Sequence, residues 1–350
     1  MRNCGPVRRM TISVSLPARI NIAGSPTDAC EGAYAILTAA IELRGGATLR
    51  ATTGPTAGGG EIAAAAIAAF CRHESTLAAR LADAPVAIET WTDVPASSGL
   101  GGSSVLVLAV LAGLRAYYGV DSRRWNDWAL AELAQRAEEH DLDVVCGFAD
   151  RYAPLFGDVA YLACHGKLWH APLGDEPYAT YETLGPHAPP LSFVVATTGV
   201  VRHSGSVHAP MRARYLEERR RGGGALLELA RQMGETAWRG KIALLAHDWI
   251  GLGRQIDRNQ QLVDAMMDAC GFASGAGEEV RALVAAARRA GALGAKLTGA
   301  GGGGAIFALP PPGGADALAD ALRDFAARQG LASEVLLLPV TRTGLRVERR

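Results

Sequence analysis

The sequence predicts an α+β protein of two domains, on three observations. The chain has 350 residues, 49% hydrophobic and 20% charged, which is enough to build one large or two ordinary cores. Its first part is rich in strand patterns, whereas residues 210–269 are mainly helical in pattern. Between them, residues 164–190 are rich in Gly, Pro and His, as expected of a connection. We therefore expect an N-terminal domain over 1–165, a linker over 166–190 and a C-terminal domain over 191–350.

The N-terminal half is predicted to contain both strands and helices. Residues 11–15 alternate weakly between polar and apolar side chains and stop before Pro17, which fits a strand leading into a turn. Strong helix formers follow Glu61, and Asp121 or Ser122 is placed to cap a later helix. The expected strands are 11–15, 35–41, 47–52, 86–92 and 157–163, and the expected helices are 61–82, a core helix containing 105–114, and one running from the cap through residue 140.

The C-terminal half opens with the buried-strand pattern of residues 191–197. The helical stretch that follows is interrupted at the three glycines 222–224 and near Gly240. A second glycine-rich loop, from Lys296 to Gly304, then leads into a strand that ends at Leu309. The remaining expected elements are helices over 279–289 and 315–329 and a closing strand over 334–340.

Composition narrows the class of partner. Lys+Arg and Asp+Glu are both 35, so no net field attracts nucleic acid or an anionic membrane, and a small molecule is the expected partner. The most apolar run, residues 105–114, ends at Arg115 and is too short to span a membrane. The six cysteines are scattered without metal-ligand spacing, and the first residues contain no apolar run of signal-peptide length. We expect reduced thiols, a cytoplasmic location and no zinc.

One glycine-rich stretch precedes the core helix and reads Pro95-Ala96-Ser97-Ser98-Gly99-Leu100-Gly101-Gly102-Ser103-Ser104. Three glycines beside hydroxyl side chains, ahead of a helix, form a backbone that wraps closely around an anion. No lysine follows the glycines, so the G-x4-G-K-[ST] pattern of P-loop proteins is absent. The stretch therefore predicts a phosphate cradle outside the P-loop class; the structural alternative is a Gly/Ser turn between a strand and a buried helix.

Polar side chains interrupt two otherwise apolar segments. Arg19, Asn21 and Asp28 surround a loop with two prolines and a glycine, and Arg19 stands between apolar neighbours. Such an arginine is either a structural ion-pair partner or a cation directed into a site. Asp150 lies in an apolar, glycine-marked stretch, where a carboxylate is costly unless it is paired, for example with Arg151, or functional. Both segments are candidate site segments.

Three motifs resemble those of the GHMP kinases, named for galactokinase, homoserine kinase, mevalonate kinase and phosphomevalonate kinase, and they occur in the family's order. They are residues 17–28, the Pro-x3-Gly-Leu-Gly loop over 95–103, and the Lys-x-Thr-Gly-x-Gly-Gly-Gly segment over 296–303. A fourth segment, with Glu138 twelve residues before Asp150, resembles the galactokinase stretch that binds magnesium and faces the acceptor hydroxyl. The chain is thus similar to this family over most of its length.

The resemblance implies a fold and a set of roles. The fold would combine an N-terminal, β-rich domain like ribosomal protein S5 with a C-terminal α/β domain of ferredoxin-like type, the active site lying in the cleft. The 95–104 loop would bind ATP, Asp150 would face the acceptor hydroxyl, and Arg19 would hold Asp150 ionised. Ser103 and Glu138 would bind Mg²⁺, with their neighbours Ser104 and Glu139 as open alternatives. Lys296 is either functional or solvated.

Phosphoryl transfer independently fits this residue set. It requires positioning and charge neutralisation more than covalent chemistry, so backbone N–H donors, one divalent cation, one arginine and one orienting carboxylate suffice. Mg²⁺ takes hard oxygen ligands and usually keeps several waters, so one hydroxyl and one carboxylate beside ATP oxygens are enough. The sequence therefore predicts an enzyme that uses ATP and Mg²⁺.

Departures from the galactokinase pattern bear on the substrate. Residues 24–28 read Gly-Ser-Pro-Thr-Asp and lack a sugar-contacting glutamate, a form that resembles glucuronokinase-type members. The predicted reaction is transfer of the γ-phosphoryl group to a sugar hydroxyl, foremost the C1 hydroxyl of a uronic acid or related aldose. The alternatives are a heptose-phosphate kinase, another substrate of the family, and a sensor that binds sugar and ATP without turnover. The expected assembly is a monomer or homodimer. The candidate substrate contacts are Asp28, Arg202, His203, Gly301 and Gly302, with Arg212 and Arg214 as further candidates for an anionic group.

Overall fold

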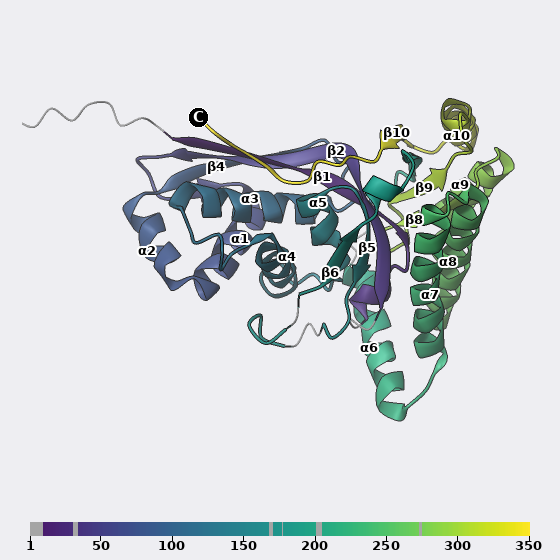
Figure 1. Cartoon of the computed structure of the whole chain (residues 1–350), viewed down its shortest axis with the longest axis horizontal. Coiled ribbons are helices and arrows are strands. Elements are labelled where there is room, and N and C mark those ends of the chain that lie inside the picture. Colours follow the sequence, from purple (N-terminus) through teal and green to yellow (C-terminus); the bar gives the residue numbers. More distant parts are fainter. Residues whose placement is uncertain (1–9, 31–33, 168–170, 177, 201–204, 273–274) are drawn as a thin grey trace, which may run out of the picture.

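Two β-sheets form the framework of the molecule (Figure 1). A computed structural model of the chain describes residues 10–30, 34–167, 171–176, 178–200, 205–272 and 275–350. Within these residues, one sheet has seven strands and the other has four. The first sheet is built mainly from the N-terminal half of the chain and the second entirely from the C-terminal half.

The first sheet has the order β11-β1-β2-β4-β3, with β5 pairing β2 and β6 pairing β5. β2 is long enough to pair with β4 along its second half and with β5 along its first half. β6 comes from the segment 166–190 that we expected to be a linker, so part of that segment belongs to the sheet. The bounds are β1 (Thr11–Ala23), β2 (Ala35–Ala51), β3 (Ala57–Gly58), β4 (Val86–Thr92), β5 (Val159–Ala163), β6 (Thr180–Thr183) and β11 (Arg346–Arg349).

The first two strands are longer than the sequence suggested. β1 does not stop before Pro17, because a register shift between Pro17 and Ala18 accommodates the residue that lacks an N–H. The two strands expected at 35–41 and 47–52 are one continuous strand. Gly46 lies within it, and an added Cβ there would be 2.1 Å from the Val14 carbonyl oxygen of β1. This close approach of β1 explains glycine at a position that looks like a turn in the sequence.

Helices cover one side of the first sheet (Figure 1). α3 begins directly after the glycine-rich loop and is the most buried of them, packing on β1 and β2. None of the helices in the described part of the chain combines the length and apolar character needed to cross a bilayer. The bounds are η1 (Thr27–Ala29), α1 (Gly60–His73), α2 (Ser75–Asp83), α3 (Gly102–Tyr118), α4 (Asp127–Arg136), η2 (Ala137–Asp141), η3 (Ala149–Arg151) and α5 (Tyr152–Phe156).

Two helix boundaries differ from those expected. The single helix expected over 61–82 breaks at Glu74, whose carboxylate accepts hydrogen bonds from Thr76 Oγ1 at 2.7 Å and Trp125 Nε1 at 3.0 Å. The cap expected at Asp121 or Ser122 is instead Asn126, whose side chain accepts from the Ala129 amide at 3.0 Å. The Glu74 bond to Trp125 joins residues far apart in the chain, so the local sequence does not reveal it. The Asn126 bond to the Ala129 amide is a local helix cap that competes with the caps expected at Asp121 and Ser122.

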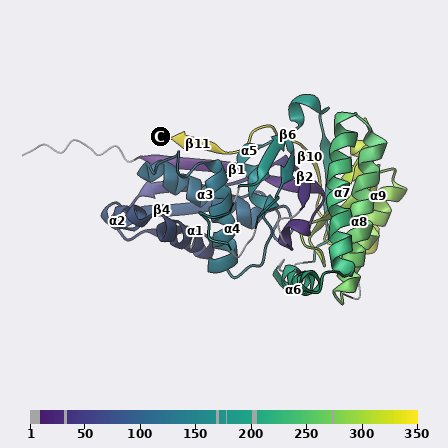
Figure 2. The same ribbon diagram turned by 60° about the horizontal axis from the view of Figure 1, so that its bottom comes forward.

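The second sheet has the order β10-β7-β9-β8, and long helices pack against it (Figure 2). The helical stretch breaks at 222–224 as expected but not near Gly240, which lies inside α7; the next break is at Asp248, which caps α8. β10 is not the closing strand, because β11 returns to the first sheet. The bounds are η4 (Gly185–His187), β7 (Ser192–Thr197), α6 (Gly205–Arg221), α7 (Ala225–Leu245), α8 (Trp249–Ala269), α9 (Glu278–Arg289), β8 (Gly294–Thr298), β9 (Ala305–Leu309), α10 (Ala315–Gln329) and β10 (Val335–Pro339).

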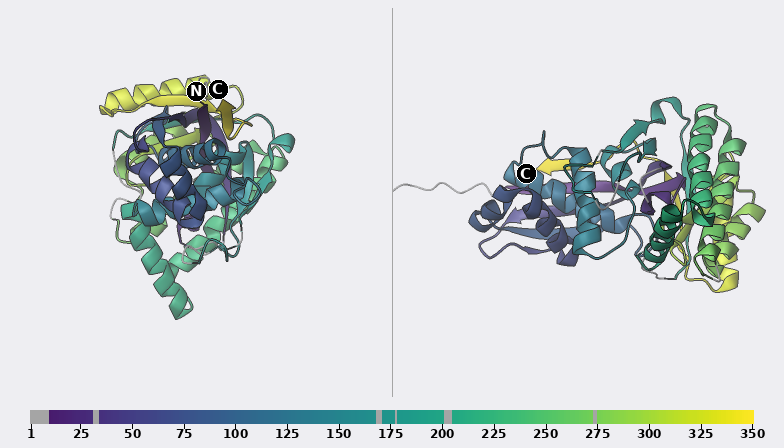
Figure 3. Two further views of the ribbon diagram at one scale, coloured as in Figure 1. Left: turned by 90° about the vertical axis from the view of Figure 1, so that its left-hand side faces the viewer. Right: turned by 90° about the horizontal axis from the view of Figure 1, so that it is seen from below.

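The two faces of β7 belong to different cores. Val194 and Ala196 pack with residues of the helices, whereas Phe193 and Val195 share a core with Ile20 and other residues of β1 and β2. This alternation follows from the two-residue period of a strand. The helices α7, α8 and α9 lie side by side at one end of the molecule (Figure 3). A shared apolar core therefore joins the halves and fixes where their loops meet.

Candidate active site

A cavity of about 670 Å³ lies where the glycine-rich loops, the Asp150 segment and the start of α6 meet. Most of the residues predicted from the sequence line it. Leu100 does not line it, but its carbonyl oxygen accepts a hydrogen bond from the Arg19 amide at 3.1 Å. Arg202 and His203 lie outside the described residues. The predicted residues that line the cavity are Arg19, Pro95, Ser97, Ser98, Gly99, Gly101, Gly102, Ser103, Ser104, Glu138, Asp150 and Gly301.

The 95–104 loop combines left-handed backbone with the start of a long helix. Ser97, Gly99 and Gly101 have φ of 54°, 73° and 85°, and α3 begins at the next residue, Gly102. The first amides of a helix have no partner inside the helix and favour an anion. The Ser98 hydroxyl is buried without a hydrogen-bond partner in the described part of the chain. The loop thus has the donors that a phosphate group requires.

The second glycine-rich loop packs directly on the first. The Thr298 hydroxyl donates to the Gly99 carbonyl oxygen at 2.8 Å, and Gly301 lines the same cavity. The Gly302 amide donates to the Ala276 carbonyl oxygen at 2.6 Å, so this group is engaged within the protein. The loop therefore forms one wall of the cavity, chiefly by supporting the 95–104 loop.

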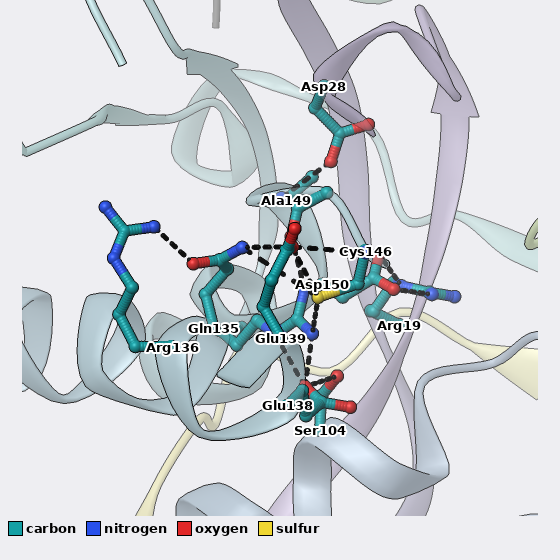
Figure 4. Close-up of polar contacts among 12 residues, drawn as sticks. Arg19, Asp28, Ser104, Gln135, Arg136, Glu138, Glu139, Cys146, Ala149 and Asp150 are labelled. Carbon is teal, nitrogen blue, oxygen red and sulfur yellow. Dashed lines mark hydrogen bonds and ion pairs between the residues drawn. The ribbon is translucent and has the colours of Figure 1, made fainter. Parts of the chain in front are cut away.

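Arg19 and Asp150 form an ion pair at the cavity wall (Figure 4). Arg19 Nε donates to Asp150 Oδ1 at 2.8 Å, and Arg19 Nη2 lies 2.6 Å from Oδ2. Asn21 Nδ2 adds a hydrogen bond to Oδ1 at 3.1 Å. Burial alone would raise the pKa of Asp150, but Arg19, Arg151 and the Asn21 hydrogen bond together hold it well below its ordinary value. Asp150 is therefore ionised, and 27% of its side chain is exposed, on the side of the cavity.

Asp28 contacts Ala149, next to Asp150 (Figure 4), and is not on the cavity lining. Its Oδ2 accepts a hydrogen bond from the Ala149 amide at 2.9 Å, which ties η1 to the Asp150 segment. Burial, and then the charge of Asp150, raises the pKa of Asp28. An added Cβ at Gly147 would be 2.1 Å from Asp28 Oδ2, so only glycine leaves room for this contact. In this structure Asp28 holds the segment that carries Asp150 in place.

Glu138, rather than Glu139, lies beside the glycine-rich loop (Figure 4). Glu138 Oε2 accepts from Ser104 Oγ at 2.8 Å and from Arg151 Nε at 2.8 Å. Ser103 lines the same cavity and is exposed. Among the described residues, the hydrogen bonds that the Glu138 carboxylate accepts all end on Oε2. Its other carboxylate oxygen, Oε1, is therefore available as a ligand for a metal cation. One carboxylate and one hydroxyl beside the phosphate loop fit Mg²⁺, which binds few protein oxygens and several waters.

Arg212 and Arg214 are committed to protein contacts. Arg212 donates to the Ala29 carbonyl oxygen and to the Cys146 carbonyl oxygen, each at 2.7 Å, and it pairs with Glu139. Arg214 pairs with Glu218 at 3.1 Å and also donates to a helix carbonyl. Neither lines the cavity. These two arginines therefore hold elements together instead of facing a substrate anion.

The site contains residues that sequence reasoning left out or left open. Lys296 is fully buried, so it is not a solvated charge. Arg151, considered only as a partner for Asp150, pairs with Glu138 instead. His208 on α6 lines the cavity and was not selected. A signal for it was present, because His208 and Arg212 are four residues apart and share one helix face.

Both halves of the chain match models of one family. The GHMP kinases N terminal domain model matches residues 61–158, and the GHMP kinases C terminal model matches residues 241–328. The fold is also found in solved structures. The galactokinase of Lactococcus lactis, crystallised with galactose, superimposes with a TM-score of 0.71 over 96% of this chain and 95% of that one, at 18% identity.

Curated relatives with different substrates are about equally similar to this chain. The mevalonate kinase of Methanothermobacter thermautotrophicus is 30% identical over 231 residues, which is 65% of each chain. The probable glucuronokinase 2 of Arabidopsis thaliana is 30% identical over 228 residues, 63% of this chain and 56% of the relative. The galactokinase of Mycobacterium bovis is 29% identical over 369 residues, 92% of this chain and 95% of the relative. The match thus covers less than two thirds of the first two relatives.

These findings confirm the resemblance stated from the motifs and the expected two-domain α+β fold. The motifs that carried the resemblance are brought to one cavity by two sheets that share a core. The chain belongs to the GHMP kinase family, a family of small-molecule kinases.

Proposed function

We propose that this protein is an ATP-dependent sugar kinase whose active site lies in the cleft between the domains 1–165 and 191–350. It transfers the γ-phosphoryl group of Mg-ATP to a sugar hydroxyl, foremost the C1 hydroxyl of a uronic acid. The observation that carries the proposal is the Arg19–Asp150 ion pair, which faces the same cavity as the 95–104 loop. It places an ionised carboxylate and a guanidinium beside a phosphate cradle, as phosphoryl transfer requires.

The 95–104 loop and the candidate metal site have different roles in binding Mg-ATP. The backbone amides at the start of α3 bind phosphate oxygens, and Glu138 with Ser103 would hold Mg²⁺. When bound, Mg²⁺ neutralises charge on the phosphate oxygens. Arg151 holds Glu138 in place through its own hydrogen bond to Oε2. Arg19 joins the 95–104 loop to Asp150, because its Nη1 donates to the Gly99 carbonyl oxygen at 2.5 Å while its Nε donates to Asp150.

The lowered pKa of Asp150 determines how this carboxylate acts on the acceptor hydroxyl. Because its pKa is held low, Asp150 is a weak base and does not remove the hydroxyl proton before transfer begins. It accepts a hydrogen bond from the hydroxyl, aligns the oxygen with the γ-phosphorus, and takes the proton as the new P–O bond forms. Arg19 stabilises the charge that spreads over the transferred group. This role suits a transition state that needs alignment more than deprotonation.

The choice of acceptor rests on the 24–28 segment and one relative. Gly24-Ser25-Pro26-Thr27-Asp28 departs from the galactokinase pattern and has the form that resembles glucuronokinase-type members. A relative named as a probable glucuronokinase is 30% identical to this chain. A heptose phosphate or another acceptor used by the family is the alternative, because relatives with other names are about as similar. We place the reaction in the cytoplasm, with a small-molecule acceptor and a monomeric or homodimeric enzyme.

A coupled ADP-release screen tests the proposal. The purified protein is assayed with Mg-ATP over uronic acids, free aldoses, heptose phosphates and mevalonate, and phosphorus NMR identifies the phosphorylated position. We expect the highest kcat/KM with a uronic acid and a product phosphorylated at C1. Ligand-induced thermal stabilisation without ADP release across the panel would mean a sensor and would refute the kinase.

The Asp150→Asn variant tests the mechanism. Removing the charge while keeping the shape should lower kcat by at least ~100-fold, the usual contribution of a group that handles a proton. The control is Asp316→Asn, which makes the same change at an exposed position on α10 and should leave kcat unchanged. An Asp150→Asn variant with the turnover of the unmodified enzyme would exclude the assigned role.

A further inference from the structure

His208 is a buried polar side chain on the cavity wall that the proposed reaction does not use. It lies on the first turn of α6 and lines the cavity together with Gly147 and Asp150. The residue is 9% exposed, and its Nδ1 is buried without a hydrogen-bond partner in the described part of the chain. Because buried polar atoms are nearly always paired, this nitrogen needs a partner that the described protein residues do not supply, either an ordered water or a ligand group that enters the cavity.

The position of His208 is fixed by the helix that carries it. Arg212, one turn further along α6, donates to the carbonyl oxygens of Ala29 and Cys146 at 2.7 Å. Residues four apart share one face of a helix, so His208 lies on the face that Arg212 anchors to the acceptor segments. The imidazole therefore belongs to the part of the cavity wall that comes from the C-terminal half of the chain, whereas Arg19 comes from β1.

The charge state of His208 suits a neutral ligand group. Burial lowers its pKa to about 4; the negative charge of Asp150 opposes this shift, and the positive charges of Arg212 and Arg151 add to it. A neutral imidazole has one N–H donor and one acceptor nitrogen. A hydroxyl group is also both donor and acceptor, so it satisfies either tautomer, whereas a carboxylate would lack the proton that an acceptor nitrogen needs.

We propose that His208 is a specificity-determining residue whose imidazole hydrogen-bonds a second hydroxyl of the acceptor sugar, near the hydroxyl aligned by Asp150. The inference rests on the proposed function, because it assumes a polyhydroxylated acceptor in this cavity. A site built to hydrogen-bond a hydroxyl rejects the analogue that lacks it, since a buried polar group is then left unpaired. His208 would thus select sugars by the presence of one hydroxyl.

The test compares the best acceptor of the screen with its monodeoxy analogues. We expect the unmodified enzyme to lose at least 100-fold in kcat/KM on one analogue. His208→Phe and His208→Ala should raise KM for the parent sugar at least tenfold, leave KM for ATP within twofold, and no longer distinguish the parent from that analogue. His208→Asn, which retains a hydrogen-bonding group near Nδ1, should recover part of the discrimination. His187→Phe, at an exposed position of η4, is the control and should behave like the unmodified enzyme.

The outcomes separate this inference from the proposed function. If the unmodified protein turns over none of the sugars, the proposed function fails, and the role of His208 fails with it. If it turns over a sugar while His208→Phe and His208→Ala keep the full discrimination against every deoxy analogue, only the role of His208 is refuted. Should His208→Phe not fold, His208→Ala supplies the same comparison, because it adds no bulk to the cavity wall.

Discussion

Lys296 is a fully buried ammonium group whose partners are neutral oxygens. Its Nζ donates to the Asn21 carbonyl oxygen and Ser25 Oγ, each at 3.2 Å, and to the Leu297 carbonyl oxygen at 3.0 Å. Burial, and then the positive charge of Arg19, lowers the pKa of Lys296 to about 7. The residue therefore links β8 of the second sheet to β1 and the 24–28 loop.

The lowered pKa predicts a stability that changes with pH. Above pH 7 the folded protein releases the Lys296 proton, while the unfolded chain keeps it up to about pH 10.4. The unfolded state then binds more protons, so this residue makes the folded state more stable as the pH rises through that interval. Lys296→Met removes the effect. We expect the free energy of unfolding of the unmodified protein, relative to Lys296→Met, to increase by up to ~1.4 kcal/mol per pH unit between pH 7 and 9.

Urea unfolding of both proteins at several pH values measures this difference. Lys241→Met is the control, because it removes the same side chain from a surface ion pair with Glu182. A Lys296→Met variant whose stability runs parallel to that of the unmodified protein from pH 7 to 9 would show that Lys296 is charged in the folded state throughout.

At the scale of elements, the two glycine-rich loops form one unit. Gly99 has a φ of 73°, and an added Cβ would be 2.3 Å from the Thr298 carbonyl oxygen. Thr298 also donates its hydroxyl hydrogen bond to Gly99, and Gly304 packs on Ser97 and Ser98. The second loop thus sets the shape of the first, although Thr298 and Gly99 are 199 residues apart in the sequence.

Gly99→Ala should therefore damage both stability and nucleotide binding. A matched control is Gly119→Ala, since Gly119 has a φ of 57° but nothing within 4 Å of its added Cβ. The left-handed backbone costs each variant about 1–2 kcal/mol, and the collision with Thr298 adds to this only at Gly99. We expect KM for ATP to rise at least tenfold in Gly99→Ala and to stay unchanged in Gly119→Ala. Equal KM values for ATP in the two variants would mean that the loops are not coupled.

For the whole molecule, the last strand returns to the first sheet. β11 pairs antiparallel with β1 at the sheet edge, with Ser13 opposite Glu348 and Ile12 opposite Arg349. Thr11 and Arg350 exchange both backbone hydrogen bonds, each at 2.9 Å. Because such pairs alternate along an antiparallel ladder, Glu348 is also a hydrogen-bonded position, whereas the Arg349 amide points away from β1. The end of the chain therefore covers the edge of the strand that carries Arg19.

Proline substitutions at residues 348 and 349 test whether the backbone hydrogen bonds between β11 and β1 stabilise the protein. Glu348→Pro removes a ladder hydrogen bond and should lower the free energy of unfolding by about 1 kcal/mol or more. Arg349→Pro keeps the ladder bonds, because its amide is not used, and should have a stability close to that of the unmodified protein. Thermal unfolding of the two variants measures the difference. An Arg349→Pro variant as destabilised as Glu348→Pro would contradict the register of β11.

Local patterns were reliable where neighbouring residues decide the structure. The β4 strand, the α10 helix and the helix break at 222–224 were all predicted, because periodicity and glycine content act over a few residues. The motifs also identified the family and the cavity-lining loop. The predicted boundary failed at Glu74, because its carboxylate accepts from Trp125, which folding brings near. The predicted cap missed Asn126, whose partner is the local Ala129 amide, because several capping residues lie close together in that segment.

Residue types and their spacing along the chain were enough to predict the family, the two-domain α+β class and the candidate residues on each motif. Which of these candidates lie close together became known from the three-dimensional fold. It paired Arg19 with Asp150 across 131 residues, engaged Arg212 in protein contacts and buried Lys296. It also placed His208, which was not among the candidates, on the cavity wall. Pairing, burial and the pKa values that follow from them depend on distance in space, and spacing along a chain does not contain that distance.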